Sequence, residues 1–365
     1  MLIPELPDYL TDLGGAEYKG YIIFLFTLSA AISRPFSGKL ADTIGRIPVM
    51  VIGASVCFVL GFVYPIVGTV TAFLILRFFH GFSTGFKPTG TSAYVADVVP
   101  ENRRGEAMGL LGVFGSLGIA AGPVIGGVIA SNLSLNVMFY SSSIFAIASV
   151  IILLGMHETV TVKHDFKLSL LIIPINEVIE PKVIGPSIVM LLYAFSFGII
   201  LTIVPDFSTH LGIENKGLFF ASFTTASILI RLLAGKLSDK YGRLPILKIA
   251  TLGVVVTMWI VGMASTKFEF LVAGALIGIA AGMNSPTIFA WTIDLSDPRH
   301  RGRAMATMYI AMEIGIGFGA LMSAFLFNNN PENLPLVFNS GAILAAIAFI
   351  YLQFVYKPRN KKNES

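Results

Sequence analysis

Four polar side chains share one face of an apolar segment between residues 70 and 95. They follow one another at spacings of 3, 4 and 3 residues: Arg77, His80, Thr84 and Lys87. At ~100° per residue in an α-helix, all four lie within about 80° of one face. Basic and hydroxyl groups in such a setting can bind a polar ligand or take part in proton transfer. We do not expect this face to contact lipid, because charges in an apolar medium need partners.

One carboxyl group, Glu313, lies inside another apolar segment, ten residues or ~15 Å beyond Arg303. We expect no other acidic residue to be buried so deeply. A carboxyl group in that position is costly to ionise, which makes Glu313 a candidate site for a proton or another cation. A local salt bridge or a neutral, hydrogen-bonded acid is the alternative.

A second polar stripe repeats the 3, 4, 3 spacing of the first. It consists of Asn284, Thr287, Trp291 and Asp294. We expect the two stripes to border a common cavity. Asn284 is the candidate cavity residue of the second stripe. Tyr193 and Phe197, four residues apart and so on one face, are candidate wall residues, although such aromatic side chains more often pack or contact lipid.

The composition indicates that the helices carrying these residues lie in a membrane. The 365 residues are 55% hydrophobic and 13% charged, with a mean hydropathy of +0.80, so lipid must surround the chain. The net charge of +4 comes from short basic clusters between apolar runs rather than from one basic face. This pattern excludes nucleic acid as a partner and is typical of membrane orientation signals.

Runs of about 20 apolar residues can cross a bilayer as helices. The sequence has eleven such runs: 20–38, 47–67, 70–95, 106–130, 134–156, 185–205, 217–235, 244–264, 268–292, 303–328 and 335–356. With connector 38–48 in the cytoplasm, most of the 25 Lys and Arg fall on that side. We therefore predict a multi-pass integral membrane protein, with the bacterial inner membrane as the expected location.

A shift of 197 residues aligns the chain with itself without a gap over more than 100 residues. Matched residues include Arg34 with Arg231, Gly38-Lys39-Leu40 with Gly235-Lys236-Leu237, Asp42 with Asp239, Gly45-Arg46 with Gly242-Arg243, Asp97 with Asp294, and Arg104-Gly105 with Arg301-Gly302. This register indicates duplication. Arg34 and Arg231 lie about one turn inside the cytoplasmic boundary, so we expect them to snorkel and to be structural.

The repeat divides the chain into four segments. We predict an N-terminal helix bundle (1–156), a cytoplasmic linker that touches the interface (157–184), a C-terminal bundle (185–356) and a basic cytoplasmic tail (357–365).

The first bundle has a short first helix. Pro7 matches Pro205, but only six residues precede Pro7, whereas about 20 helical residues precede Pro205. We therefore expect an N-terminal truncation or a misassigned start, with the first helix largely missing.

Two connectors give the strongest sequence signal, and each joins two predicted helices. They read GKLADTIGRIP at 38–48 and GKLSDKYGRLP at 235–245. Both closely resemble the signature loop of the major facilitator superfamily, which occurs between helices 2 and 3 and again between helices 8 and 9. The resemblance implies cytoplasmic gating loops that stabilise one access state. The residues that match are Gly38, Asp42, Gly45 and Arg46, and in the copy Gly235, Asp239, Gly242 and Arg243.

Two further segments resemble motifs of the same family. Leu76 to Gly81 resembles an arginine-bearing motif on helix 4, which implies that Arg77 takes part in proton coupling or substrate binding. Gly118 to Gly127 resembles the antiporter motif of helix 5 in proton-coupled drug exporters; its residues are Gly118, Gly122, Pro123, Gly126 and Gly127. Helix packing through small residues is the alternative explanation for these glycines.

Several other chemistries find no support in the sequence. Gly-Lys in the connectors lacks the upstream glycine of a P-loop, so ATP is not expected as the energy source. Cys57 is the single cysteine, and the five histidines are scattered, so we expect neither a metal site nor catalytic residues. No hydrolase motif occurs, and we predict that the chain is not an enzyme.

We predict an all-α membrane protein with the major facilitator fold, built from two pseudo-symmetric six-helix halves. The expected function is secondary transport by alternating access, with proton-coupled efflux of small amphipathic compounds. The partners are a small-molecule substrate and the lipid bilayer, the chain is expected to be a monomer, and an ion gradient replaces any cofactor. Transport of a defined metabolite such as a sugar, or a non-transporting receptor or inactive fragment of the same fold, is the alternative.

Overall fold

The computed structural model describes residues 2, 5–15, 18–213, 217–328 and 330–355. These residues form helices and connecting turns and contain no strand. Eleven helices are long: α2 (Lys19–Thr43), α3 (Arg46–Val63), α4 (Val70–Val98), α5 (Arg104–Asn132), α6 (Leu135–Leu154), α8 (Ile184–His210), α9 (Gly217–Tyr241), α10 (Arg243–Met263), α11 (Lys267–Leu295), α12 (Arg301–Phe327) and α13 (Leu334–Ile350). Each predicted apolar run corresponds to one of them, which confirms the all-α fold. The predicted tail 357–365 lies outside the described residues.

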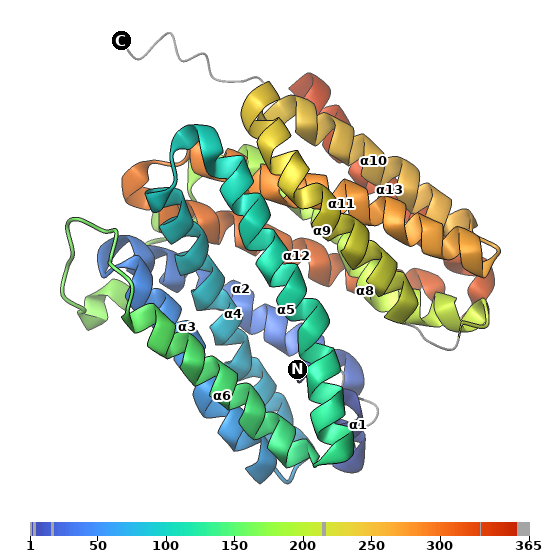
Figure 1. The fold of residues 1–365 in the computed structure, drawn as a ribbon, viewed down its shortest axis with the longest axis horizontal. Coiled ribbons are helices and arrows are strands. Elements are labelled where there is room, and N and C mark those ends of the chain that lie inside the picture. The colour runs from blue at the N-terminus through green and yellow to red at the C-terminus, as the bar shows by residue number, and fades with distance from the viewer. Residues whose placement is uncertain (1, 3–4, 16–17, 214–216, 329, 356–365) are drawn as a thin grey trace.

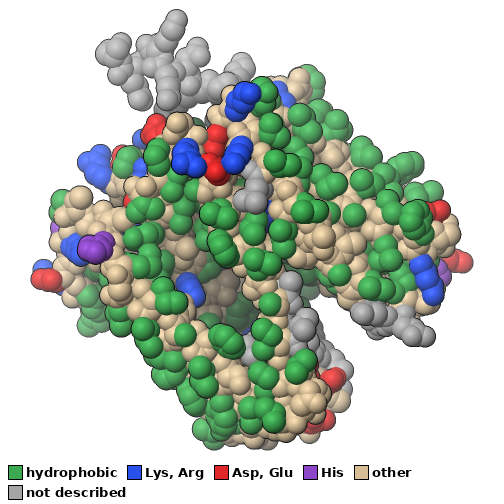
Figure 2. Space-filling model, viewed as in Figure 1, with side chains coloured by type: hydrophobic (Ala, Val, Ile, Leu, Met, Phe, Trp, Pro, Cys, Tyr) green, Lys and Arg blue, Asp and Glu red, His purple; other side chains and the backbone are tan. Residues whose placement is uncertain are grey.

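Eight spans within the described residues are long and apolar enough to cross a membrane, or nine if the bent α9 is counted as one span. Helices α4 and α5 are not among the eight. Charged side chains gather toward one end of the face shown in Figure 2, whereas hydrophobic side chains cover much of its flanks. These features fit a multi-pass integral membrane protein.

The two halves lie side by side, with α1 to α6 in one and α8 to α13 in the other (Figure 1). Helices α3 and α6 form the outer side of the first half, and α10 and α13 that of the second. The halves meet where α2 packs against α12 and where α5 packs against α9. These two contacts are related by the internal repeat.

Among the described residues, the helix of the first half that matches α8 is short. That helix, α1 (Leu6–Asp12), has 7 residues, whereas α8 has 27. In the second half, Gly315 and Gly319 of α12 pack closely against the backbone of Leu191 and Phe195 of α8. Gly118, the repeat-mate of Gly315 on α5, has no atom within 4 Å of the position that a Cβ would occupy. Close packing against α8 therefore explains Gly315 and Gly319 of α12.

The connectors are mostly helical, which corrects the prediction of loops at 38–48 and 235–245. α2 continues to Thr43 and α3 begins at Arg46; in the copy, α9 continues to Tyr241 and α10 begins at Arg243. Only a sharp break remains, at Gly45 (φ 126°) and at Gly242 (φ 91°). Residues that carry a side chain rarely adopt this left-handed backbone conformation, so glycine is required at both breaks.

The linker between the halves lies against both of them. It contains a 3₁₀ turn at Leu168–Leu171, the short helix α7 (Ile175–Val178) and a second 3₁₀ turn at Pro181–Val183. α7 contacts both α2 and α12. The linker is therefore placed to join the two halves at their cytoplasmic ends.

Candidate functional site

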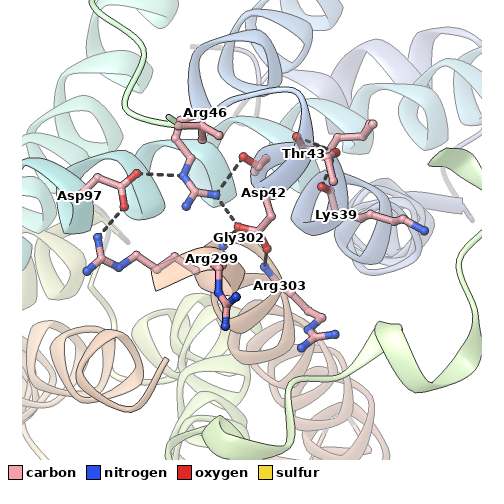
Figure 3. A network of polar contacts seen from close by, with 12 residues as sticks. Lys39, Asp42, Thr43, Arg46, Asp97, Arg299, Gly302 and Arg303 are labelled. Atoms are coloured by element: carbon pink, nitrogen blue, oxygen red, sulfur yellow. Dashed lines mark hydrogen bonds and ion pairs between the residues drawn. The ribbon is translucent and has the colours of Figure 1, made fainter. Parts of the chain in front are cut away.

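The carboxylate of Asp42, near the end of α2, caps the first turn of α12 in the other half (Figure 3). Its Oδ1 accepts a hydrogen bond from the backbone N–H of Gly302 at 2.6 Å, and its Oδ2 accepts one from that of Arg303 at 2.8 Å. The first N–H groups of a helix have no partner inside the helix and carry partial positive charge. A carboxylate from the opposite half satisfies them here, so Asp42 joins the halves directly.

Arg46 connects Asp42 to Asp97, the last acidic residue of α4. Its guanidinium pairs with Asp42 and donates from Nε to Asp97 Oδ2 at 3.0 Å (Figure 3). The other oxygen of Asp97 accepts a hydrogen bond at 2.5 Å from Arg301 at the start of α12. Asp42, Arg46, Asp97 and Arg301 form what we call the first latch. It ties α2, α3 and α4 to α12.

The same helix-capping contact occurs at the other junction between the halves. Asp239 of α9 accepts hydrogen bonds from the backbone N–H groups of Gly105 at 2.8 Å and Glu106 at 2.9 Å, both in the first turn of α5. Arg243 donates to Asp239 at 2.5 Å. Each contact is the repeat-mate of one at Asp42.

Asp294 completes this second set. It accepts a hydrogen bond from Arg243 at 2.8 Å and one from Arg104 of the first half at 3.1 Å. Asp239, Arg243, Asp294 and Arg104 are the second latch. One end of the molecule is therefore closed by two related sets of ion pairs, each crossing from one half to the other.

The first latch is more shielded from water than the second. The Arg46 and Asp97 side chains are 3% and 13% exposed, against 11% and 30% for Arg243 and Asp294. Glu158 of the linker region also caps α3, because it accepts hydrogen bonds from the backbone N–H of Arg46 at 3.0 Å. We expect the first latch to hold more strongly, since ion pairs weaken with solvent exposure.

Gly38 and Gly235 lie beside the latches. They allow two helices to approach closely and do not form a turn. A Cβ on Gly38 would lie 2.8 Å from the Cβ of Ala306 and 3.1 Å from the Cα of Arg303, both on α12. At the second junction, Gly235 packs in the same way against the backbone of Gly105. Gly38, Asp42 and their copies Gly235 and Asp239 thus lie at the two contacts between the halves, whereas Gly45 and Gly242 lie at the helix breaks.

The linker adds a further cross-connection. Lys39 of α2 lies 3.0 Å from Glu177 of α7, while Glu180 pairs with Arg303 of α12. Glu180 is only 4% exposed, and its backbone N–H donates to Thr307 at 2.9 Å. Glu180 is therefore buried as fully as Glu313, contrary to the expectation that Glu313 is the one deeply buried acid.

Glu313 is paired with Arg34 across the boundary between the halves. The Nη2 atom of Arg34 lies 3.0 Å from Glu313 Oε1, and both side chains are buried. Arg34 also donates to Thr89 of α4 at 3.0 Å and lies over the ring of Tyr309 at 4.1 Å from its centroid. The Tyr309 hydroxyl lies 3.0 Å from that of Ser92. The guanidinium is thus surrounded by partners from both halves.

This arrangement corrects the prediction that Arg34 snorkels to the cytoplasmic boundary. Because α2 continues to Thr43, Arg34 lies nine residues, or ~13 Å, from the helix end. Its exposed fraction is 0%. Arg34 is a buried partner of the candidate proton site.

Arg77 and His80 form a separate cluster inside the first half. Arg77 donates from Nη1 to the Tyr64 hydroxyl at 3.3 Å, and that hydroxyl lies 3.1 Å from His80 Nδ1. The Arg77 guanidinium also lies 4.5 Å from the ring centroid of Phe26. Both polar residues are nearly buried, which fits the prediction that this face avoids lipid.

The other two predicted cavity residues lie elsewhere. Lys87 donates to Ser149 of α6 at 2.8 Å. Asn284 is completely buried in the second half, and neither polar atom of its amide has a hydrogen-bond partner. The polar stripes therefore occupy separate places in the two halves, and none of the hydrogen bonds of their described residues joins them to Glu313.

The residues of the antiporter motif lie within the helix α5. Gly118, Gly122, Gly126 and Gly127 lie within this helix, and the side chain of Pro123 lies outside the described residues. Gly118 leaves open space beside the helix.

Several functional candidates were missed from the sequence. They are Arg34, Asp97, Arg104, Glu180, Arg301 and Tyr309, whereas Asp294 was expected at a cavity rather than in a latch. For the latch residues a signal was present, since Asp97 and Arg104 are matched in the repeat. For Arg34 and Tyr309, only the folded arrangement shows their relation to Glu313.

Comparisons with known proteins agree on one family. The family model described as Major Facilitator Superfamily matches residues 1–214 and 186–365. Multidrug resistance protein 2 of Bacillus subtilis (strain 168) is 24% identical over 377 residues, covering 100% of this chain and 92% of the relative. Quinolone resistance protein NorA of Staphylococcus aureus (strain MRSA252) is 24% identical over 385 residues, with 100% and 95% covered.

The fold has also been seen in solved structures. The proton:xylose symporter XylE, bound to 6-bromo-6-deoxy-D-glucose, superimposes with a TM-score of 0.78 at 17% identity. The match covers 97% of this chain and 91% of that one.

Proposed function

The chain belongs to the Major Facilitator Superfamily, and we propose that it exports small amphipathic compounds in exchange for protons. Proteins of this family are transporters rather than enzymes. The observation that supports the proposal most directly is the buried ion pair between Arg34 and Glu313, which joins the two halves inside the spans. An ionisable pair in that position can respond both to a proton and to the relative motion of the halves.

The proposed mechanism is alternating access. In the state described here, both latches hold the cytoplasmic ends of the halves together, so a substrate would have to leave toward the opposite side. Rocking of the halves would break the contacts of Asp42 and Asp239 with the opposite helices and open the cytoplasmic side. The repeat makes this motion symmetric, because each half contributes one capping carboxylate and receives one.

Glu313 is the proposed proton site. As a carboxylate it attracts the guanidinium of Arg34, and the pair stabilises contact between α2 and α12. A proton on Glu313 would remove this attraction and leave the halves freer to separate. Proton binding on one side of the membrane and release on the other would then drive substrate movement without ATP or a bound cofactor.

Efflux of amphipathic compounds is favoured by the relatives, whose names describe multidrug and quinolone resistance, and by the antiporter motif on α5. Carriage of a defined metabolite such as a sugar remains the second candidate within the same fold. The bacterial inner membrane is the proposed location, and a monomer is the proposed state.

Flux in proteoliposomes tests the proposal. Purified protein would be reconstituted with an imposed pH gradient, and movement of a fluorescent amphipathic dye would be followed together with internal pH. We expect dye to move against its gradient while protons move in the opposite direction. Dye movement without proton movement would contradict the coupling. A lack of movement for every dye, together with proton-linked movement of a sugar, would support the second candidate.

A further inference from the structure

Arg231 is the repeat-mate of Arg34, but its surroundings differ in a way that points to a ligand. Both arginines lie well inside their helices and face the opposite half. Arg34 pairs with Glu313, whereas Arg231 has no acidic partner among the described residues. Its hydrogen bonds go to two neutral hydroxyl groups, those of Ser227 at 3.1 Å and Ser285 at 2.9 Å.

The repeat shows which groups are missing around Arg231. The positions that correspond to Glu313 and Tyr309 are Ser116 and Gly112 of α5. A Cβ on Gly112 would lie 3.3 Å from the Cζ of Arg231, so this glycine directly faces the guanidinium. Ser116 is one turn further along the same face of α5. The second half therefore carries the cation, but α5 of the first half carries neither the carboxylate nor the ring that cover Arg34.

A guanidinium within a membrane span is costly without an opposite charge. Arg34 meets this need internally and is fully buried. Arg231 is half-buried and has no such internal acidic partner among the described residues.

We propose that Arg231 is the anion-binding subsite of the transported molecule. The ligand would be an amphipathic compound with a carboxylate, sulfonate or phosphate group, which the planar guanidinium can bind through two hydrogen bonds. Ser285, whose hydroxyl accepts a hydrogen bond from the guanidinium, would orient it toward the ligand. This inference rests on the proposed export function and narrows its substrate class.

Two matched probes test the subsite in proteoliposomes: an amphipathic fluorophore with a free carboxylate, and the methyl ester of the same fluorophore. For Arg231→Gln we expect about a ten-fold or larger loss of carboxylate flux, with ester flux within about two-fold of the wild type. Arg231→Lys keeps the charge and should retain much of the carboxylate flux. Equal loss of both probes in Arg231→Gln would show a structural role and overturn the proposal.

Restoring the missing acid gives an independent test with Arg231 intact. Ser116→Glu recreates the pairing seen at Arg34, so the new carboxylate should occupy the guanidinium and block the carboxylate probe as strongly as Arg231→Gln does. Ser116→Gln is the matched neutral control and should leave that flux largely unchanged. If the two Ser116 variants behave alike, the proposal is wrong. Thermal unfolding in detergent would verify that each variant is folded.

Two outcomes separate this inference from the export function. Ester transport by the wild type without carboxylate transport would overturn the subsite while leaving the transporter intact, whereas no movement of either probe would contradict export itself. Exchange of chloride for a bulky inert anion distinguishes the ligand source. If the difference between wild type and Arg231→Gln vanishes without chloride, Arg231 binds an inorganic ion and the proposal is overturned.

Discussion

The guanidinium of Arg34 lies 3.0 Å from the carboxylate of Glu313 across the boundary between the halves, although the two residues are 279 positions apart in sequence. Both groups are buried, and the pair lies deeper than the latches at the cytoplasmic ends. Any rocking of α2 against α12 must therefore disturb it. The pair is placed to couple the charge of Glu313 to the conformation of the transporter.

Replacement of Glu313 by Gln should uncouple transport from the pH gradient. The amide preserves the size of the side chain and can accept a hydrogen bond from Arg34, but it neither ionises nor binds a proton. We expect downhill exchange of dye to persist, while accumulation driven by an imposed pH gradient is lost. Proteoliposome flux at several gradients measures both. Glu332→Gln, at an exposed turn, is the control, and an unchanged gradient response in Glu313→Gln would eliminate the proton role.

Removal of Arg34 alone should be more damaging than removal of the pair. Arg34→Met leaves a buried carboxylate without its cation, which typically costs about 3–5 kcal/mol, whereas the double variant Arg34→Met with Glu313→Gln leaves no buried charge. We expect a clear drop in Tm for the single variant and partial recovery in the double one. Thermal unfolding of all four forms in detergent gives the coupling energy. Additive losses would mean that the two residues do not interact.

The helices and the two-half organisation were predictable because they follow from local pattern. Length and hydropathy locate the spans, and the 197-residue register identifies the halves. Helix ends were less certain: charged residues such as Lys39 and Asp42 suggested a loop, yet α2 continues through them to Thr43. Because the helix end lies further along the chain than predicted, Arg34 lies deeper in the helix than expected, and its contact with Glu313 was not predicted.

The partners of the latch residues could not be read from the sequence in the same way. Asp42 pairs with Arg46 and also binds the N-terminus of a helix in the other half. The identity of the helix depends on how two distant segments pack, because Gly302 is 260 residues away. Repeat symmetry relates the two latches, but only tertiary structure shows that each crosses to the other half.

Asp42→Asn should loosen the cytoplasmic closure. Asparagine has one acceptor oxygen and no charge, so it cannot cap two N–H groups of α12 and pair with Arg46; hydrogen bonds to charged groups contribute about 1.5–3 kcal/mol. A reporter cysteine at Ala306, which packs against Gly38, can be placed in a Cys57→Ser background. We expect a membrane-impermeant maleimide to react about ten-fold faster from the cytoplasmic side.

The corresponding change at the second junction, Asp239→Asn, should have a smaller effect on the same reporter, because that latch is more exposed. Asp165→Asn in the exposed part of the linker is the control for charge loss alone. If Asp165→Asn accelerates labelling as much as Asp42→Asn does, the latch is not what closes this side.

Gly38→Ala should open the same contact by steric means. The added methyl group meets the Cβ of Ala306 at 2.8 Å and the backbone of α12 at 3.1 Å, so the two helices must move apart. Overpacking of this kind costs about 1–3 kcal/mol, and we expect a lower Tm and faster labelling of a cytoplasmic reporter. Gly118→Ala is the matched control, since its methyl group meets no described atom within 4 Å and alanine favours helix. Equal destabilisation by both substitutions would show that general helix effects, rather than contact between the halves, account for the loss. A loss confined to Gly38→Ala would show that Gly38 stabilises the closed state.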